Sequence, residues 1–302
     1  MKNLLSCCLV CAYAVLMSVG MFACSEKADD CVKIEYDNYI SYTNLSYGTH
    51  ERHEIDLCLP KNKTGKIGMI FMIHGGGWVA GDKSGYATDL VNWCEQQGYV
   101  AAAINYRYAS ESIHVDELLD DISASLVKIK EVAKEYEIDV DKMLLTGGSA
   151  GGHLSLLYAY SRAEEAAINP AAVVSFCGPT DLNDENFFLE DSNLGAVLEM
   201  AWKISGERFT RETVSHAVEA LAHASPISYV SNSSVPTVIC HGTIDDLVPY
   251  SNATILKNKL DVYGVENVLV PYQNSGHGLE NDPTAAATAN NLMSDYALRF
   301  LD

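Results

Sequence analysis

Positive charge is scarce in this chain of 302 residues. Lysine and arginine together number 20 against 40 aspartates and glutamates, which gives a formal net charge of −20. Such a surface repels the phosphates of nucleic acids and anionic lipid headgroups, so the composition argues against a nucleic-acid-binding protein. Because 48% of the residues are hydrophobic, the chain is nevertheless able to bury the core of one large domain.

Metal-binding spacings of cysteine and histidine are absent after Cys24. That part of the chain has no Cys-x-x-Cys and no His-x-x-x-His pair, so we expect no metal and no other cofactor. It contains an odd number of cysteines without regular spacing, which is not a disulfide framework. A single bridge between Cys31 and Cys58 stays open. Cys177 and Cys240 lie in apolar runs, where cysteine usually acts as a small buried hydrophobe.

Charge is also absent between Leu4 and Ala23. This apolar run follows a single lysine and precedes acidic sequence, which is the layout of an export signal. The small Ala23 before Cys24 resembles the processing site of bacterial lipoproteins, where the cysteine is lipidated. We therefore expect a signal peptide over residues 1–23, a polar tether over 24–31 and a folded domain over 32–302. The protein would be exported, periplasmic or at the cell surface, and held to the membrane only through a lipid on Cys24.

Two other interpretations of this leader stay open. About 20 apolar residues suffice to span a bilayer, so the run is also long enough for an uncleaved anchor. Simple secretion after cleavage is the second alternative.

Strand and helix patterns alternate along the rest of the chain. One helix shows apolar residues at a helical period with charged residues opposite. The strands are nearly all apolar, which is typical of strands covered on both faces. Strands are predicted at residues 67–73, 99–108, 143–146, 171–177, 237–240 and 267–272, and helices at 91–97, 115–136, 153–160, 251–263 and 285–300. This order predicts an α/β fold with a mostly parallel central sheet and helices on both faces.

One long segment, residues 182–224, interrupts this alternation before the penultimate strand. Its apolar patches at Phe187 and Trp202 predict a helical excursion above the sheet. Because ligands bind at the carboxyl ends of parallel strands, such an excursion commonly forms a lid or a substrate wall. A helical hairpin packed on the side of the domain is the alternative.

The most informative motif is Gly147-Gly148-Ser149-Ala150-Gly151. It stands between a predicted buried strand and a predicted helix. Glycines on both sides of the serine permit a tight turn that exposes its hydroxyl and aims the N–H of Ala150 at an oxyanion. The context therefore predicts a nucleophilic Ser149.

A serine nucleophile needs a base and an orienting acid. His277 lies between two glycines just after the last predicted strand, where its ring is free to reach a site at the sheet edge. The acid is expected after the penultimate strand, and Asp245 is the better candidate because the following Leu247-Val248-Pro249 folds the loop back. Asp246 and Asp181 are the alternatives.

An oxyanion hole is predicted at His74-Gly75-Gly76-Gly77-Trp78. Three glycines after an apolar strand leave backbone N–H groups unobstructed, so Gly76 and Gly77 would act together with Ala150. Four aromatic residues are further candidates for the substrate pocket: Trp78, Tyr108, Phe187 and Trp202. His74, His153 and His241 are expected to bond loop backbone, and Arg107 and Asp121 to be structural partners.

Together these motifs, with Ala224-Ser225-Pro226 before the penultimate strand, resemble the esterase and lipase branch of the α/β-hydrolases. The branch includes hormone-sensitive-lipase-like carboxylesterases and feruloyl- and acetylxylan-esterase-like enzymes. The long N-terminal cap of the former has no counterpart here, which favours the carbohydrate-esterase-like relatives. The resemblance covers residues 55–301 and implies a serine carboxylesterase that forms an acyl-enzyme.

The resemblance also leaves the substrate open. Export would suit deacylation of plant-type polysaccharides that carry acetyl or feruloyl esters. Amide or peptide hydrolysis by the same machinery is one alternative. A non-catalytic surface lipoprotein that binds glycan or protein is another.

Overall fold

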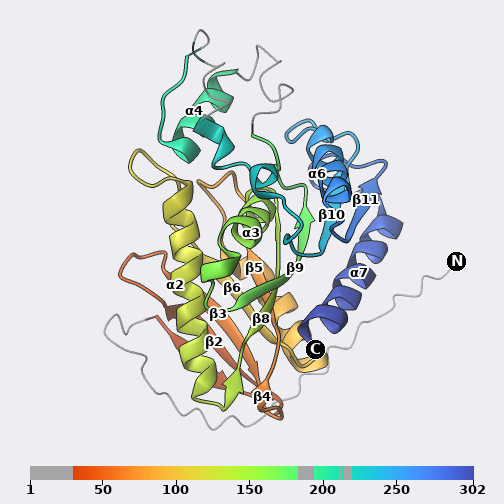
Figure 1. The fold of residues 1–302 in the computed structure, drawn as a ribbon. Helices are drawn as coiled ribbons and strands as arrows, with labels where there is room; N and C mark the ends of the chain where they lie inside the picture. Colours follow the sequence, from red (N-terminus) through yellow and green to blue (C-terminus); the bar gives the residue numbers. More distant parts are fainter. Residues whose placement is uncertain (1–29, 183–193, 211–212, 214–219) are drawn as a thin grey trace, which may run out of the picture.

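The computed structural model describes residues 30–182, 194–210, 213 and 220–302. Its centre is a nine-stranded sheet in the order β1-β2-β3-β6-β5-β8-β9-β10-β11 (Figure 1). The strands β6, β5, β8, β9, β10 and β11 pair with one another in parallel. The strands β1, β2 and β3 pair antiparallel, and β3 also pairs antiparallel with β6. The strands are β1 (Val32–Glu35), β2 (Tyr39–Ser46), β3 (Glu54–Pro60), β5 (Met69–Ile73), β6 (Val100–Asn105), β8 (Lys142–Gly148), β9 (Asn169–Phe176), β10 (Thr237–Gly242) and β11 (Asn267–Tyr272). A separate short pair joins β4 (Gly65–Lys66) to β7 (Ile138–Asp139).

Helices cover both faces of this sheet. The core on one face includes residues of α2, α3 and α6, and the core on the other includes residues of α1, η2 and α7. The α-helices are α1 (Ala87–Val91), α2 (Val115–Lys134), α3 (Ala150–Ser161), α4 (Leu194–Ser205), α6 (Ser251–Val262) and α7 (Pro283–Leu301), with a π-helical turn η2 (Asn92–Gln96) and short 3₁₀ turns η1 (Lys83–Tyr86), η3 (Ala163–Glu165) and η5 (Pro226–Tyr229).

Side chains of the central strands alternate between the two cores. On β5, Met69, Phe71 and Ile73 belong to the α2/α3 side, whereas Ile70 and Met72 belong to the α7 side. Successive side chains of a strand point to opposite faces, so a strand covered on both faces must be apolar throughout. This explains the continuous apolar runs that predicted the strands.

The predicted fold class is confirmed. One predicted strand, residues 99–108, is too long, because β6 ends at Asn105. Beyond it the backbone carbonyl of Tyr106 accepts a hydrogen bond from the side chain of Arg52 rather than from a neighbouring strand. The antiparallel strands β1 to β3 were not predicted. The described cysteines form no disulfide with one another, so Cys31 and Cys58 are not bridged to each other. Among the described helices, none combines the length and the apolar character needed to cross a bilayer.

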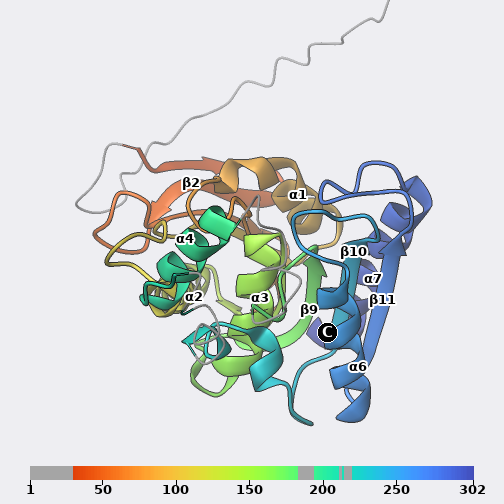
Figure 2. The same cartoon turned by 90° about the horizontal axis from the view of Figure 1, so that it is seen from above.

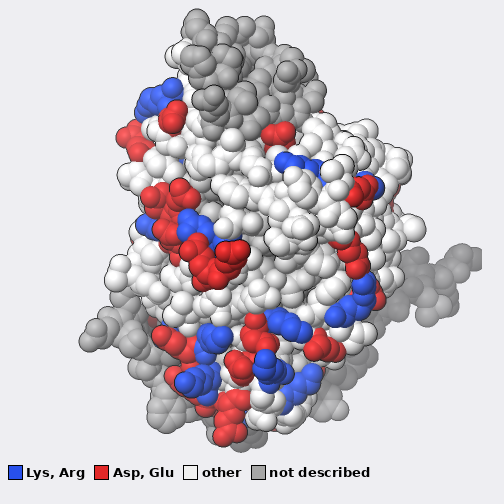
Figure 3. All heavy atoms as spheres, in the orientation of Figure 1, with Lys and Arg blue, Asp and Glu red and all other residues white. Residues whose placement is uncertain are grey.

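Helix α4, part of the segment expected to leave the sheet, lies above the carboxyl ends of the strands (Figures 1 and 2). The ring of His114, which precedes α2, bonds the carbonyl of Lys203 in α4 at 2.9 Å. Helix α4 is therefore bonded to the residue that precedes α2. On the face shown in Figure 3, acidic and basic side chains are interspersed rather than gathered in one large patch of one sign.

Candidate active site

Ser149 occupies the turn between β8 and α3. Its backbone has φ 54° and ψ −121°, a strained conformation for a residue with a side chain. The turn is held on both sides, because the amide of Ser149 donates to the carbonyl of Phe176 at 2.7 Å and its carbonyl accepts from His153 at 3.0 Å. This is the geometry predicted for a nucleophile elbow.

The first turn of α3 passes so close to β5 that a side chain would not fit. A Cβ atom added to Gly151 would lie 2.0 Å from the carbonyl oxygen of Ile73. Glycine at this position therefore allows α3 to start directly after Ser149.

His277 and Asp245 are brought together from two different loops. His277 Nδ1 lies 2.8 Å from Asp245 Oδ2. The other oxygen of the carboxylate, Oδ1, accepts hydrogen bonds from the amides of Leu247 and Val248, both at 2.9 Å. The alternative acids are placed differently: Asp246 is exposed, and Asp181 lies beside Asn252, whose side chain accepts from its amide.

Burial of Asp245 alone would raise the pKa of its carboxyl, but hydrogen bonds from His241, His277 and the backbone hold that pKa below its usual range. The carboxylate of Asp245 is therefore charged in the folded protein at neutral pH. A charged acceptor at Nδ1 favours the His277 tautomer that keeps Nε2 free to accept a proton.

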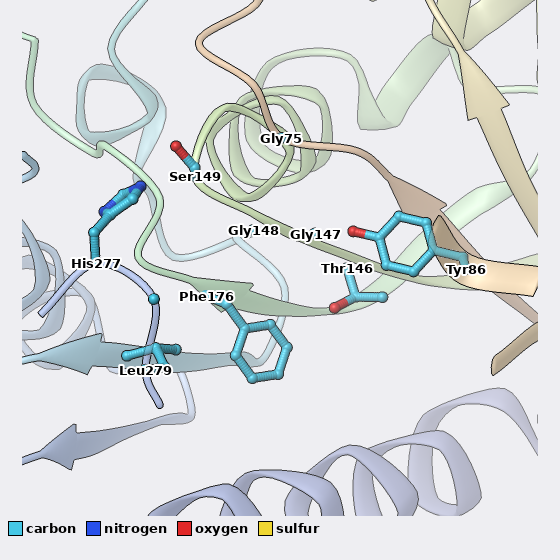
Figure 4. A pocket seen from close by; sticks show the side chains of 10 residues that line it. Gly75, Tyr86, Thr146, Gly147, Gly148, Ser149, Phe176, His277 and Leu279 are labelled. Carbon is cyan, nitrogen blue, oxygen red and sulfur yellow. The ribbon is translucent and has the colours of Figure 1, made fainter. Parts of the chain in front are cut away.

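Ser149 and His277 line one pocket of about 450 Å³. Figure 4 shows the ring of His277 beside the side chain of Ser149. The side chains of Phe176 and Leu279 lie below them in this view and that of Tyr86 lies to the right, and all three line the pocket. These three residues were not predicted. Phe176 is the last residue of β9 and Leu279 lies in the loop after β11, close to His277, so their positions at the carboxyl ends of strands could have indicated them. No pattern in the sequence indicated Tyr86.

The loop predicted as an oxyanion hole runs next to Ser149. A Cβ on Gly75 would lie 3.5 Å from the Cβ of Ser149. Gly76 and Gly77 both have positive φ, at 109° and 58°, which side chains rarely adopt. Within the described part of the chain, the amides of Gly76, Gly77 and Ala150 donate to no protein acceptor. They are thus available to a ligand.

The four aromatic residues predicted at the substrate pocket are dispersed. Trp78 is buried, and its indole donates to His153 Nδ1 at 3.1 Å. It lines a second hollow of about 250 Å³ between the Gly77 segment and α4. Tyr108 donates to the carbonyl of Gly81 at 2.7 Å, and Trp202 stacks under Arg208; neither is among the residues found around the two hollows. Phe187, like Cys24, lies outside the described residues.

Three other histidines and the pair of Arg107 and Asp121 have structural contacts, as expected. His153 bonds the carbonyl of Ala224 at 2.7 Å, and His241 that of Val248 at 2.9 Å. The guanidinium of Arg107 lies 2.7 Å from Asp121. His74 bonds the carbonyl of Gly75 at 2.7 Å.

One buried group of described residues, Cys177, His241 and Asp245, has donor atoms within 4.8 Å of one another. A metal would need a thiolate there, but burial raises the pKa of Cys177 to about 12. Both oxygens of Asp245 already accept hydrogen bonds. The chemistry of the donors therefore fits a support for Asp245 better than a metal site.

Comparison with known families gives one match over most of the chain. The BD-FAE family model matches residues 55–260. In sequence the chain is 29% identical over 269 residues to the probable carboxylic ester hydrolase LipM of Mycobacterium tuberculosis, covering 84% of this chain and 59% of LipM. It also resembles esterase LipC of the same organism, at 24% identity over 86% of this chain and 66% of LipC. The chain thus spans less than two thirds of the length of these relatives.

Solved structures share the fold. A truncated carbohydrate esterase from gut microbiota superposes with a TM-score of 0.69 at 23% identity, covering 88% of this chain and 100% of that one. An inhibited esterase B from Lactobacillus rhamnosis has a TM-score of 0.68 at 20% identity, covering 87% and 88%.

Proposed function

Since this chain belongs to the BD-FAE family and has the α/β-hydrolase fold, we propose that it is a serine hydrolase of carboxylic esters. Support comes first from one observation: His277, paired with Asp245 at 2.8 Å, lines the same pocket as Ser149 at its strained turn. The curated relatives named as ester hydrolases support the same chemistry.

In this proposal Ser149 Oγ attacks the acyl carbon while His277 Nε2 takes the hydroxyl proton. Asp245 holds the ring by accepting from Nδ1 and stabilises the imidazolium that forms. The amides of Gly76, Gly77 and Ala150 donate to the developing oxyanion, each worth roughly 3 kcal/mol of barrier in acyl transfer. His277 then protonates the leaving alcohol, and water attacks the acyl-enzyme by the same route in reverse.

We further propose that the esters are those of polysaccharides, with acetyl or feruloyl groups as the acyl part. The family and the likeness to a carbohydrate esterase support this substrate class. The wall of Tyr86, Phe176 and Leu279 beside Ser149 offers an apolar surface to the acyl group. Export and lipidation at Cys24, if processing follows the leader sequence, would bring the enzyme to such a substrate.

The test compares the wild type with Ser149→Ala and with Ser233→Ala, which removes an exposed serine elsewhere. Wild type and Ser233→Ala are expected to hydrolyse p-nitrophenyl acetate and to be labelled by a fluorophosphonate. Ser149→Ala should lose labelling and several orders of magnitude in kcat. Retained turnover in Ser149→Ala would overturn the nucleophile, and a wild type that is not labelled would indicate a binding protein instead.

A panel of acetyl, butyryl, octanoyl and feruloyl esters, with matching amides, tests the substrate class. Release of acetate or ferulate from xylan is the expected result. Activity confined to triglycerides or to amides would contradict it.

Lipidation has its own test. Cells that export the protein are grown in medium that contains a fatty-acid analogue. The analogue should label the wild type but not Cys24→Ser. Equal labelling of the two would contradict attachment at Cys24.

A further inference from the structure

The direction of the Gly76 N–H is fixed from the other end of its peptide group. In a trans peptide the carbonyl of one residue and the N–H of the next point in opposite directions. Whatever holds the carbonyl of Gly75 therefore aims the N–H of Gly76, and whatever holds the carbonyl of Gly76 aims the N–H of Gly77.

The two carbonyls are held in different ways. That of Gly76 accepts hydrogen bonds from the amides of Val79 and Ala80, at 3.1 and 3.0 Å. That of Gly75 lies 2.7 Å from His74 Nδ1. Backbone amides always carry their proton, whereas Nδ1 carries one in only one of the two neutral tautomers of histidine. The Gly76 donor thus depends on the tautomer of His74.

Arg52 determines that tautomer. Its Nη2 lies 3.0 Å from His74 Nε2. Arginine has donors only and stays protonated, so Nε2 must accept and the proton of the neutral ring must sit on Nδ1, facing the Gly75 carbonyl. Burial lowers the pKa of His74 to about 4, and the ring is therefore neutral at neutral pH.

Arg52 is itself fixed by contacts on several sides. It comes from the turn between β2 and β3, and its Nε donates to the carbonyl of Tyr106 at 2.8 Å. Nη2 also lies 3.1 Å from the carbonyl of Gly81, which accepts from the Tyr108 hydroxyl as well. The guanidinium stacks on the Tyr108 ring, 3.8 Å from its centre. The turn of an antiparallel hairpin is thereby connected to the loop beside Ser149.

We propose that Arg52 is a positioning residue for oxyanion stabilisation: by locking His74 with its proton on Nδ1, it holds the Gly75 carbonyl and keeps the Gly76 N–H directed away from the loop. This inference rests on the proposed ester hydrolysis. It gives a role to a residue that lines neither hollow and lies outside the motifs of the sequence.

The test uses Arg52→Met, which removes every donor, Arg52→Lys, which keeps one charge, and Arg52→Ala. For Arg52→Met we expect kcat to fall about 10- to 100-fold with KM little changed, because only the transition state uses the donor. Arg52→Lys should be intermediate. Millimolar guanidinium should restore part of the kcat of Arg52→Ala, whereas sodium chloride at equal ionic strength should not.

A matched control is Arg299→Met, which removes a guanidinium that pairs with Glu266 at the surface of α7; its kcat should stay at the wild-type value. Urea unfolding shows whether each variant is folded under assay conditions. A folded Arg52→Met enzyme with wild-type kcat would overturn the proposal.

A second measurement does not depend on turnover. ¹⁵N NMR of the imidazole nitrogens, assigned with His74→Asn, should show His74 protonated on Nδ1 in the wild type and a loss of that single tautomer in Arg52→Met. A wild-type His74 with its proton on Nε2 would overturn the proposal whatever the kinetics. If the wild type neither hydrolyses esters nor reacts with a fluorophosphonate, the ester-hydrolase proposal fails, and the NMR result still decides the link between Arg52 and His74.

Discussion

The carboxylate of Asp245 has two separate tasks. Oδ2 faces His277, while Oδ1 accepts from the backbone of Leu247 and Val248. An amide in its place offers only one acceptor oxygen. An asparagine that keeps its oxygen on the loop amides therefore turns its NH2 group toward His277 Nδ1 and favours the wrong tautomer of the ring.

Replacing Asp245 with asparagine should lower kcat by about 10⁴-fold, the size typical when the orienting acid of a triad is lost. The matched change is Asp246→Asn, at the exposed neighbour, which we expect to keep kcat within about twofold since exposed changes are usually near neutral. The measurement is hydrolysis of p-nitrophenyl acetate by both folded variants. If Asp246→Asn were the inactive one, the acid would be wrongly assigned.

The turn that joins β8 to α3 and contains Ser149 packs closely against β5. Gly151 allows the helix to approach the Ile73 carbonyl, and any side chain there meets backbone that belongs to the neighbouring strand β5. Backbone of a central strand cannot shift without disturbing the pairing on either side. The elbow is therefore a constraint on folding as well as on the exposure of Ser149.

Gly151→Ala should thus destabilise the protein by about 3 kcal/mol or more, the range of severe overpacking. Gly85→Ala is the control, because a Cβ there meets nothing within 4 Å; it should change stability by about 0.5 kcal/mol or less, or raise it slightly. Urea unfolding monitored by tryptophan fluorescence gives both values. Equal stability of the two variants would show that α3 moves away from β5 more easily than its packing indicates.

Which elements could be predicted follows from how they are buried. Strand β5 is covered on both faces and gives a continuous apolar run that stands out in the sequence. Strand β1, at the edge of the sheet, mixes exposed and half-buried residues over four positions, a pattern that loops share. Helix α2 was predicted because one face is buried along all of its length.

The residues of the candidate site also differ in whether a local sequence pattern could predict them. Ser149, Asp245 and His277 were predicted because each follows a strand within a short glycine-containing motif. Arg52 and Tyr86 were not, because their relation to the site arises from contacts across the sheet edge, at sequence separations that no local pattern records.

Two neutral histidines, His153 and His74, connect segments that come from different parts of the molecule around the site. His153 on α3 accepts from Trp78 and bonds the carbonyl of Ala224, so it joins the loop that contains Gly76 and Gly77 to the segment just before η5. His74 joins that loop to the β2–β3 turn through Arg52. Both rings are almost fully buried, and protonating either one would put a charge in the interior.

Stability should therefore fall as the pH is lowered from about 6.5 to about 4. Burial lowers the pKa of both His74 and His153 to about 4 in the folded protein, whereas an unfolded histidine has a pKa of about 6.5. In that window the unfolded chain binds more protons, so the free energy of unfolding decreases with falling pH, by up to about 1.4 kcal/mol per pH unit for each histidine. Urea unfolding between pH 7 and 4.5 measures the slope. His153→Gln keeps a donor and an acceptor but cannot titrate. The slope of its free energy of unfolding against pH should therefore correspond to the uptake of nearly one proton fewer on unfolding. A slope equal to that of the wild type would mean that His153 is charged in the folded protein.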